Sequence, residues 1–218
     1  MLGSGALIEC LAHPDVADVL SVVRRPAGVR HAKLTEIVHD DFLDFSGVTG
    51  RLSGHHACLF CLGVSSAGMS EDAYRRVTRD VTLAAARTLL EESPGLTFCF
   101  ISGAGTDSSE KGRVMWARVK GETENRLLEL PFGGVWLFRP GYVQPMKGVR
   151  SRTRMYNLAY AVLGPLYPVL TRLGPGVVTT TEKLGLALIR AARDGAAKKV
   201  LENRDINELA ATEGSRLA

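Results

Sequence analysis

The sequence predicts an α/β protein with a Rossmann-like, doubly wound parallel sheet, and two patterns carry this prediction. Short apolar runs alternate with longer amphipathic segments along most of the chain. Such alternation is typical of βαβ units, whose right-handed crossovers build a parallel sheet. In addition, the run Ala57–Leu62 is apolar without interruption, as expected of a strand that helices cover on both faces.

Each expected element follows from its own stretch of sequence. Strands are expected at residues 19–23, 34–39, 57–62, 96–101 and 135–138, and helices at 2–11, 70–92, 114–130, 182–192 and 206–211. The strands are apolar, partly β-branched runs that end at polar or turn-forming residues. The second helix begins at Ser70, because a serine can cap the first turn and the acidic Glu71 and Asp72 favour the positive end of the helix dipole.

Length and composition narrow the class of protein. The chain has 218 residues, 45% of them hydrophobic, which suits a single domain over residues 1–218 and excludes a disordered or collagen-like chain. A net charge of +4 is a mild excess, so we expect no nucleic-acid partner. Four cysteines form no disulfide framework, and residues 1–10 lack the basic start of a signal peptide. We therefore expect a cytoplasmic protein.

The pattern changes after Pro145, where a basic group precedes an apolar stretch. The basic residues are Lys147, Arg150, Arg152 and Arg154, and they could bind an anionic ligand or form a solvated loop. The stretch Met155–Leu173 approaches membrane-spanning length, but Gly164-Pro165 and Pro168 interrupt it. We expect residues 146–180 to form a small helical region on the substrate side or an oligomer surface. We do not expect membrane association.

The candidate site lies beyond the carboxyl ends of the strands, because doubly wound sheets bind ligands there. Arg24 and Arg25 follow one strand; guanidinium groups suit a ribose 2′-phosphate, although a solvated strand end is an equal alternative. Asp40-Asp41 follow the next strand and could contact an adenine amino group or form a solvated turn. Gly63–Gly68 would let a ligand approach the backbone closely, and Ser102–Thr106 places two hydroxyls at another strand end.

Taken together, these segments resemble an atypical short-chain dehydrogenase/reductase of the NAD(P)-dependent epimerase/dehydratase superfamily, in its Tat-interacting-protein-like branch. The resemblance covers nearly the whole chain and rests on Arg24-Arg25, Cys61-Leu62-Gly63, Ile101-Ser102-Gly103-Ala104, Val119-Lys120-Gly121-Glu122 and Arg139-Pro140-Gly141. It implies an NADP(H) cofactor, with NAD possible, and a small-molecule substrate. By this resemblance Ser102 would orient a substrate oxygen, and Lys120 would hold the nicotinamide ribose and lower a neighbouring pKa. The residues expected to contact the cofactor are Gly3, Arg24, Arg25, Asp41, Leu62, Gly63, Lys120, Arg139, Pro140 and Gly141.

The chain departs from the family at the catalytic tyrosine. The family uses Tyr-x-x-x-Lys, which places both side chains on one face of a helix. Here the tyrosine position is Trp116, whose indole donates a hydrogen bond but cannot relay a proton. Ordinary tyrosine–lysine chemistry is therefore in doubt, and Tyr74 and Tyr142 are weak candidates for a relocated acid.

A second departure concerns the start of the chain. The family opens with a strand and a glycine-rich turn that holds the diphosphate, and here Gly3 stands where the last of those glycines would be. Losing roughly five buried apolar side chains, at about 1.5–3 kcal/mol each, would rival the whole stability of a domain. We therefore expect the functional protein to begin upstream of Met1, unless another segment or subunit fills the gap.

The pair Cys58 and Cys61 matches C-x-x-C and follows His55-His56, as in some metal sites. Residues three apart in a strand point to opposite faces, so these thiols cannot share a metal ion. We expect them to pack in the core and expect no metal site.

Three functions remain open from the sequence. The first is an NADP(H)-binding oxidoreductase or epimerase-like enzyme, in which Ser102, Lys120 and Trp116 form the catalytic positions. The second is a non-catalytic NADP(H)-binding regulator or redox sensor, in which Trp116 replaces the acid because no proton moves. The third is an interaction protein without a cofactor. Bound NADPH that a carbonyl or quinone oxidises would distinguish the first from the second.

Overall fold

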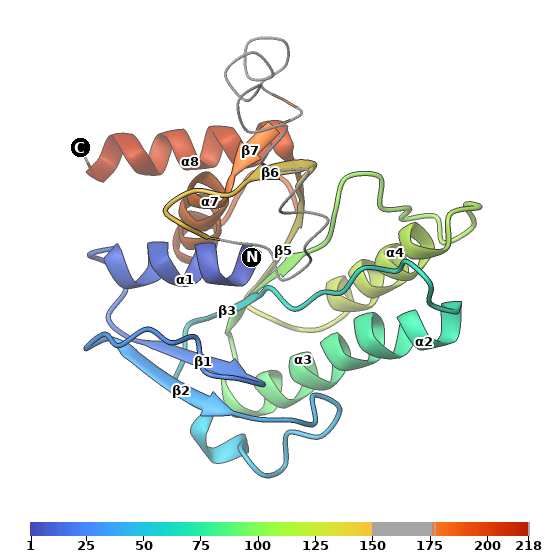
Figure 1. Cartoon of the computed structure of the whole chain (residues 1–218), viewed down its shortest axis with the longest axis horizontal. Coiled ribbons are helices and arrows are strands. Elements are labelled where there is room, and N and C mark those ends of the chain that lie inside the picture. Colours follow the sequence, from blue (N-terminus) through green and yellow to red (C-terminus); the bar gives the residue numbers. More distant parts are fainter. Residues whose placement is uncertain (150–175, 177, 218) are drawn as a thin grey trace.

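The protein is described by a computed structural model over residues 1–149, 176 and 178–217, and its strands are all paired in parallel (Figure 1). The main sheet has the order β3-β4-β5-β8, formed by Ala57–Phe60, Thr97–Ile101, Gly134–Arg139 and Val200–Glu202. A second sheet pairs β1 (Val19–Val23) with β2 (Leu34–Val38), and a third pairs β6 (Tyr142–Gln144) with β7 (Val178–Thr180). The predicted parallel α/β fold is confirmed.

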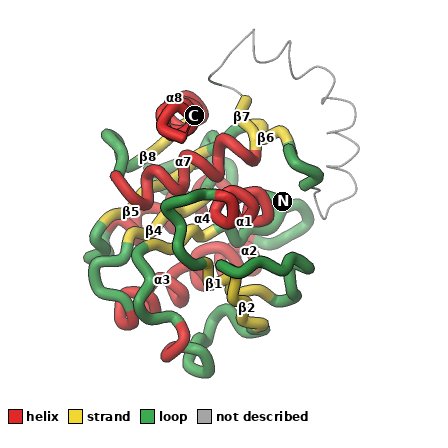
Figure 2. Tube along the Cα trace, turned by 90° about the vertical axis from the view of Figure 1, so that its left-hand side faces the viewer, coloured by secondary structure: helices red, strands yellow, loops and turns green. Residues whose placement is uncertain are grey.

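Helices cover both faces of the main sheet, as the doubly wound prediction requires. Figure 2 shows α1, α7 and α8 on one side of the strands and α3 on the other. These helices span Leu2–Ala12, Thr181–Asp194, Asn203–Leu217 and Val81–Glu92, and α4 spans Met115–Leu128. Alternate residues of one strand serve the two layers: Phe98 and Phe100 of β4 belong to the core with α3, whereas Cys99 and Ile101 belong to the core with α7.

The helices α1 and α7 approach closely because glycine lies at their contact. A Cβ atom on Gly185 would lie 2.6 Å from Cγ of Glu9, and one on Gly5 would lie 2.7 Å from Cβ of Thr181. Larger side chains at these positions would push the helices apart. The small residues of the first helix therefore have a packing role that its apolar composition alone did not specify.

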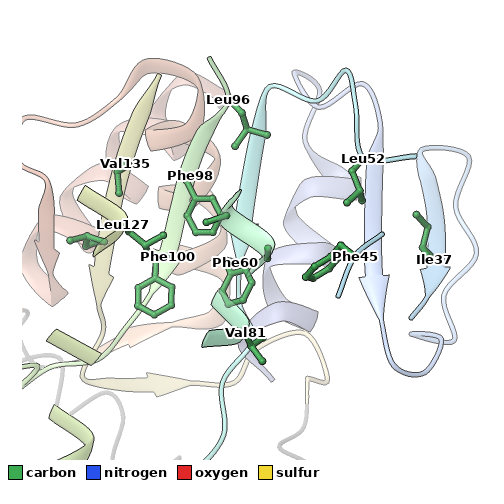
Figure 3. Packing of buried hydrophobic residues seen from close by; sticks show 13 residues of the cluster. Ile37, Phe45, Leu52, Phe60, Val81, Leu96, Phe98, Phe100, Leu127 and Val135 are labelled. Atoms are coloured by element: carbon green, nitrogen blue, oxygen red, sulfur yellow. The ribbon is translucent and has the colours of Figure 1, made fainter. Parts of the chain in front are cut away.

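The main sheet and the β1-β2 sheet share one hydrophobic core, although no backbone hydrogen-bond ladder joins them within the described residues. In the described part of the chain, β1 pairs only with β2, and β3 pairs only with β4. Figure 3 shows Phe45 and Leu52, from the connection after β2, lying between Ile37 of β2 and Phe60 of β3. The expectation of a further strand ahead of residue 1 stays a prediction.

Three features differ from the expected elements. The helix starting at Ser70 is confirmed, but a π-helical turn, η2 (Arg76–Asp80), separates α2 (Glu71–Arg75) from α3. The last helix is longer than residues 206–211, because its polar second half is held by ion pairs rather than by an apolar stripe. The strands β6, β7 and β8 were not predicted, since each has three residues and cannot display an alternating pattern.

The predicted helical region at 146–180, with Arg150, Arg152, Arg154 and the apolar stretch 155–173, lies almost entirely outside the described residues. Lys147 is described, and its half-exposed side chain forms ion pairs: its Nζ lies 2.7 Å from Oε1 of the buried Glu9 and 3.0 Å from Oε1 of Glu182. That the basic group could bind an anionic ligand stays a prediction. Among the described helices, none is long and apolar enough to span a bilayer.

Candidate functional site

The candidate site is built where β4 and β5 end and α4 crosses above them. The backbone N–H of Ser102 donates to Phe138 O at 2.7 Å, and that of Ala104 donates to Pro140 O at 2.9 Å. Lys120 of α4 donates from Nζ to the backbone oxygen of Ser102 at 2.7 Å. Three segments that are far apart in the sequence are thereby brought together, as the sequence predicted for Ser102 and Lys120.

Two buried hydroxyls follow the end of β4. The side-chain oxygens of Ser102 and Thr106 lie 2.8 Å apart, and the Thr106 hydroxyl donates to Gly103 O at 2.7 Å. Ser102 and Thr106 are 6% and 7% exposed, so little water competes for these bonds. The loop is held to α4 as well, because Asp107 N donates to Ala117 O at 3.1 Å.

Trp116 lies one helical turn before Lys120 on the same face of α4. A Cβ atom on Gly105 would lie 3.6 Å from Cη2 of Trp116, so the indole packs over the loop that carries the two hydroxyls. Gly105 has a φ of +85°, a conformation that favours glycine. Trp116 therefore occupies the place expected from the sequence, next to the candidate chemistry but without a proton to exchange.

Lys120 is the titratable group at the centre of the site. Burial lowers the pKa of its ammonium to about 8, and the charge of Glu124 opposes that shift only in part. Glu124 is one turn further along α4, but its carboxylate accepts hydrogen bonds from Nε of Arg139, at 3.0 and 3.2 Å. Glu124 was not singled out from the sequence, although its i+4 spacing from Lys120 was a usable signal.

The segment Arg139-Pro140-Gly141 lines this edge mainly through its backbone. The Arg139 side chain is 11% exposed and is bound to Glu124, with Glu202 at 3.6 Å. Its pKa is raised chiefly by the hydrogen bond to Glu124. Gly141 N donates to the Asn203 side chain at 2.9 Å. The guanidinium of Arg139 is therefore committed to internal contacts, and its predicted cofactor contact stays a prediction.

The expected diphosphate end lies beside the end of β3. The helix α1 begins at Leu2, and the side chain of its N-cap residue, Met1, makes no capping hydrogen bond. A Cβ atom on Gly3 would lie 3.2 Å from Cβ of Cys61, which places the helix start next to Cys61-Leu62-Gly63. The structure thus brings together the predicted residues Gly3, Leu62 and Gly63.

Arg24 and Arg25 follow β1 and are exposed, and no other residue in the described ranges forms an ion pair or hydrogen bond with their side chains. Asp41 follows β2, and its carboxylate accepts a hydrogen bond from Leu43 N at 2.9 Å, which closes its own turn. The strands of both sheets point the same way in Figure 3. The arginines and Ser102, to whose backbone oxygen Lys120 donates, therefore follow strand ends on the same side of the molecule.

The two tyrosines considered as a relocated acid lie in α2 and β6. Tyr74 is 2% exposed within α2, and burial raises its pKa. Tyr142 donates from its hydroxyl to Gln144 at 2.6 Å, and burial raises its pKa as well. A role of either tyrosine as the acid stays a prediction.

Cys58 and Cys61 pack on opposite faces of the sheet, because one contributes to the core with α3 and the other to the core with α7. Burial raises the pKa of the Cys61 thiol to about 12 and that of Cys58 further still. The expectation that the C-x-x-C pair cannot share a metal ion is confirmed by this placement.

No family model matches the chain. It is 30% identical over 166 residues to the protein Fmp52-1, mitochondrial, of Aspergillus terreus, an alignment that covers 73% of this chain and 68% of that relative. It is 32% identical over 102 residues to the protein HTATIP2 of Rattus norvegicus, which covers 46% of this chain and 40% of that protein.

Solved structures share the fold. The enzyme WbmG of Bordetella bronchiseptica, in complex with NAD and UDP, superposes with a TM-score of 0.62 at 11% identity over 98% of this chain and 75% of that one. The UDP-N-acetylglucosamine 4-epimerase of Methanobrevibacter ruminantium gives a TM-score of 0.61 at 13% identity, over 92% and 71% of the two chains. Identities this low establish the fold alone.

The expectation of a cytoplasmic protein is contradicted, because three curated relatives are named as mitochondrial proteins. The expectation rested on residues 1–10 and on cysteine usage. Neither feature distinguishes two reducing compartments from each other, so composition could not have decided the location.

Proposed function

Since the chain belongs to the short-chain dehydrogenase/reductase superfamily, in its Tat-interacting-protein-like branch, we propose that it is a nicotinamide-dinucleotide-dependent oxidoreductase or epimerase-like enzyme that prefers NADP(H). Its substrate is a small molecule with a carbonyl or hydroxyl group. The observation that carries the proposal is the Lys120 ammonium held on Ser102 O, 2.7 Å away, at the carboxyl end of β4. An ammonium in this position can donate to oxygens of a ribose or of a substrate.

The residues present fit a dinucleotide along the strand ends. The uncapped start of α1 beside Cys61 offers N–H groups and the positive end of the helix dipole to a diphosphate. Gly63, which follows β3, leaves space at the backbone, since a Cβ there would meet nothing within 4 Å. When bound, the nicotinamide supplies or accepts a hydride. The chain's own residues bind it, orient the substrate and hold the proton at Lys120.

The preference for NADP(H) rests on the two exposed arginines after β1. A 2′-phosphate accepts charge-assisted hydrogen bonds from guanidinium groups, each contributing roughly 1.5–3 kcal/mol. A free 2′-hydroxyl would favour an acidic residue at this place, and the carboxylate of Asp41 after β2 is already engaged with Leu43 N.

Cofactor binding is tested by thermal-shift and fluorescence titration of the chain with NADPH and with NADH. Arg24→Ala combined with Arg25→Ala should weaken NADPH binding at least tenfold and change NADH binding little. Arg51→Ala is the matched control, because Arg51 is an exposed arginine at the end of the short helix η1 (Thr49–Arg51) and not at the end of β1. An equal loss for both dinucleotides would contradict the proposed 2′-phosphate contact.

A second function, a non-catalytic NADP(H)-binding regulator, is favoured by one observation: Trp116 packs over Gly105 where the family has its acid. A panel of carbonyls and quinones that leaves bound NADPH unoxidised would favour the regulator. Turnover that appears only in Trp116→Tyr would indicate that an ancestral activity has been lost. The names of the curated relatives also support a mitochondrial location for this chain, which cell fractionation would test.

A further inference from the structure

Ser102 and Thr106, which follow β4, each have one hydroxyl proton, and both protons are used in hydrogen bonds within the protein. A hydroxyl group carries one proton. That of Thr106 goes to Gly103 O at 2.7 Å, so Ser102 must be the donor in the 2.8 Å bond between the two side chains. Ser102 therefore presents lone pairs, not a proton, to a ligand. In this arrangement it accepts a hydrogen bond from a hydroxyl group and cannot protonate an oxygen.

The neighbouring polar groups supply no exchangeable proton either. The indole of Trp116 does not titrate usefully. Glu124 is bound by the Arg139 guanidinium, which stays charged at all relevant pH values. Of Ser102, Trp116, Glu124 and Lys120, these assignments leave Lys120 as the group whose protons can move.

The ammonium of Lys120 has protons that no described residue accepts. One of its three protons goes to Ser102 O, and no other described residue accepts from Nζ. The ammonium also lies beside the open backbone of Gly103, since a Cβ atom there would be 3.7 Å from Nζ. Burial lowers the pKa of Lys120 to about 8, which is close to a working pH and suits a general acid–base group.

We propose that Lys120 itself carries the proton of the reaction, in place of an aromatic hydroxyl at position 116. This inference rests on the proposed nicotinamide-linked reaction. In the reducing direction, the carbonyl carbon gains a C–H bond from the hydride that the dihydronicotinamide supplies. The C=O π pair moves to the oxygen, which takes a proton from Nζ; the N–H pair stays on nitrogen, and the amine regains a proton from water. The oxidising direction is the reverse.

The decisive variant is Lys120→Arg. Arginine keeps a positive charge and several N–H donors, but it does not release a proton in proteins. We expect the variant to bind NADPH within a few-fold of wild type and to lose turnover by about 10²–10⁴-fold, the usual contribution of a general acid–base group. Lys183→Arg, an exposed lysine of α7, is the matched control and should leave turnover and NADPH affinity unchanged.

A second measurement does not depend on turnover. The amine titration of Lys120 is followed by NMR of the full chain with ¹³C-labelled lysine, and the Lys120→Arg spectrum assigns the signal. A midpoint near pH 8 that also governs the pH profile of turnover supports the proposal. A midpoint at the ordinary lysine value, or a Lys120→Arg variant that binds NADPH and keeps turnover within tenfold of wild type, overturns it. A wild-type chain that binds no nicotinamide dinucleotide overturns the proposed function instead, and this inference with it.

Discussion

Two polar clusters of this protein bury charge in opposite ways. One surrounds Glu213 of α8, whose side chain is fully buried and accepts from Arg193 at 2.8 Å, from Arg216 at 2.9 Å and from His13 at 3.0 Å. The other surrounds Lys120, whose ammonium, within the described part of the chain, donates only to the backbone oxygen of Ser102. The first cluster pairs its buried charge with opposite charges; the second leaves it with a neutral dipole.

The pKa values of Glu213 and Lys120 reflect this difference. The pKa of Glu213 is lowered to about 2, first by the hydrogen bond from Arg193 and further by those from Arg216 and His13. The pKa of Lys120 is lowered to about 8 by burial. For an acid, a lowered pKa means that the charged form is stabilised; for a base, it means that the charged form is destabilised. The Glu213 cluster stabilises the fold, whereas Lys120 costs stability at neutral pH.

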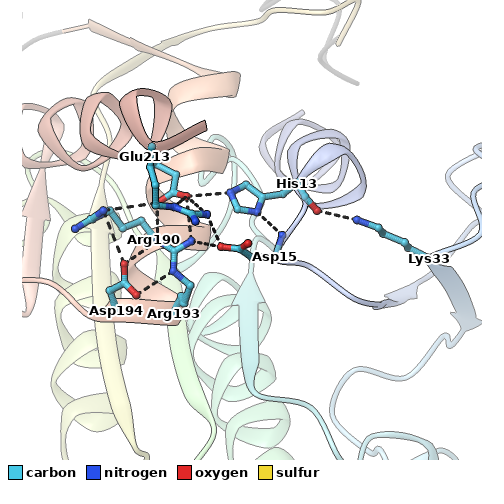
Figure 4. Close-up of polar contacts among 8 residues, drawn as sticks. His13, Asp15, Lys33, Arg190, Arg193, Asp194 and Glu213 are labelled. Carbon is cyan, nitrogen blue, oxygen red and sulfur yellow. Dashed lines mark hydrogen bonds and ion pairs between the residues drawn. The ribbon is translucent and has the colours of Figure 1, made fainter. Parts of the chain in front are cut away.

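Figure 4 shows what the Glu213 cluster connects. Arg190, Arg193 and Asp194 come from α7, His13 and Asp15 follow α1, and Lys33 donates to His13 O at 2.7 Å. His13, Asp15 and Glu213 have ligand atoms within 4.8 Å of one another, as a cation site would require. However, guanidinium groups already neutralise both carboxylates, so the cluster is better explained as a clamp that holds α8 and α1 to α7.

The largest expected effect is at the clamp. Glu213→Gln should lower the free energy of unfolding by about 3–5 kcal/mol, because the buried carboxylate accepts hydrogen bonds from Arg193, Arg216 and His13, and hydrogen bonds to a charged group contribute roughly 1.5–3 kcal/mol each. Urea unfolding of wild type and variant measures this difference. Glu208→Gln removes an exposed ion pair with Arg204 on the same helix and should change stability by about 0.5 kcal/mol or less. Similar losses in both variants would contradict the distinction between a buried clamp and a surface pair.

The direction of the Glu213 pKa shift determines how the contribution of the clamp to stability depends on pH. The pKa of Glu213 is about 2 in the folded chain and has its ordinary value of 4.5 when the chain is unfolded. Its contribution is therefore complete above about pH 4.5 and is lost as pH falls through 2. Chemical unfolding measured across the acid range should show a steeper loss of stability in wild type than in Glu213→Gln; equal slopes would exclude Glu213 as a major source of acid sensitivity.

A smaller loss of stability is expected for a substitution where α4 meets the loop of the candidate site. A Cβ atom on Gly121 would lie 1.8 Å from the backbone oxygen of Asp107. Gly121→Ala should therefore cost about 1–3 kcal/mol in urea unfolding, as overpacking usually does. Gly214→Ala is the matched change in α8, where a Cβ would meet nothing within 4 Å, and it should stabilise the chain by about 0.5–1 kcal/mol. If Gly121→Ala leaves the free energy of unfolding unchanged, the loop must be able to move away from α4 without cost.

The smallest expected effect is a gain in stability, opposite in sign to the loss expected for Glu213→Gln. Lys120→Met should raise the free energy of unfolding at pH 7 by about 1–2 kcal/mol, because it removes a buried ammonium that lacks a carboxylate partner. The cost in wild type is complete below pH 8 and is relieved as pH rises from 8 towards 10.5, so the gain should shrink across that interval. Urea unfolding at pH 7 and pH 10 measures both; a loss of stability at pH 7 would place Lys120 among the structural ion pairs.

The same contrast separates what could be predicted from what could not. The hydroxyl of Ser102 was noticed at a strand end, which is a local pattern, and the resemblance to the family then implied roles for Ser102 and Lys120; the structure places the two in contact. The clamp was missed, since His13 and Glu213 are 200 positions apart and each resembles an ordinary surface residue in sequence. The commitment of Arg139 to Glu124 was also missed, although both residues lie in elements that were predicted correctly.

The sequence by itself determined the alternation of strands and helices, the parallel sheet and the edge at which we propose that a ligand binds. These follow from hydrophobic periodicity and chain direction, which act over a few residues at a time. Only the tertiary structure decided which charges are paired. Burial and long-range contact set the free energy of a charged group, and these depend on packing rather than on neighbours in the chain. Lys120 and Glu213 therefore have opposite effects on stability, although both lie on helices of the same chain.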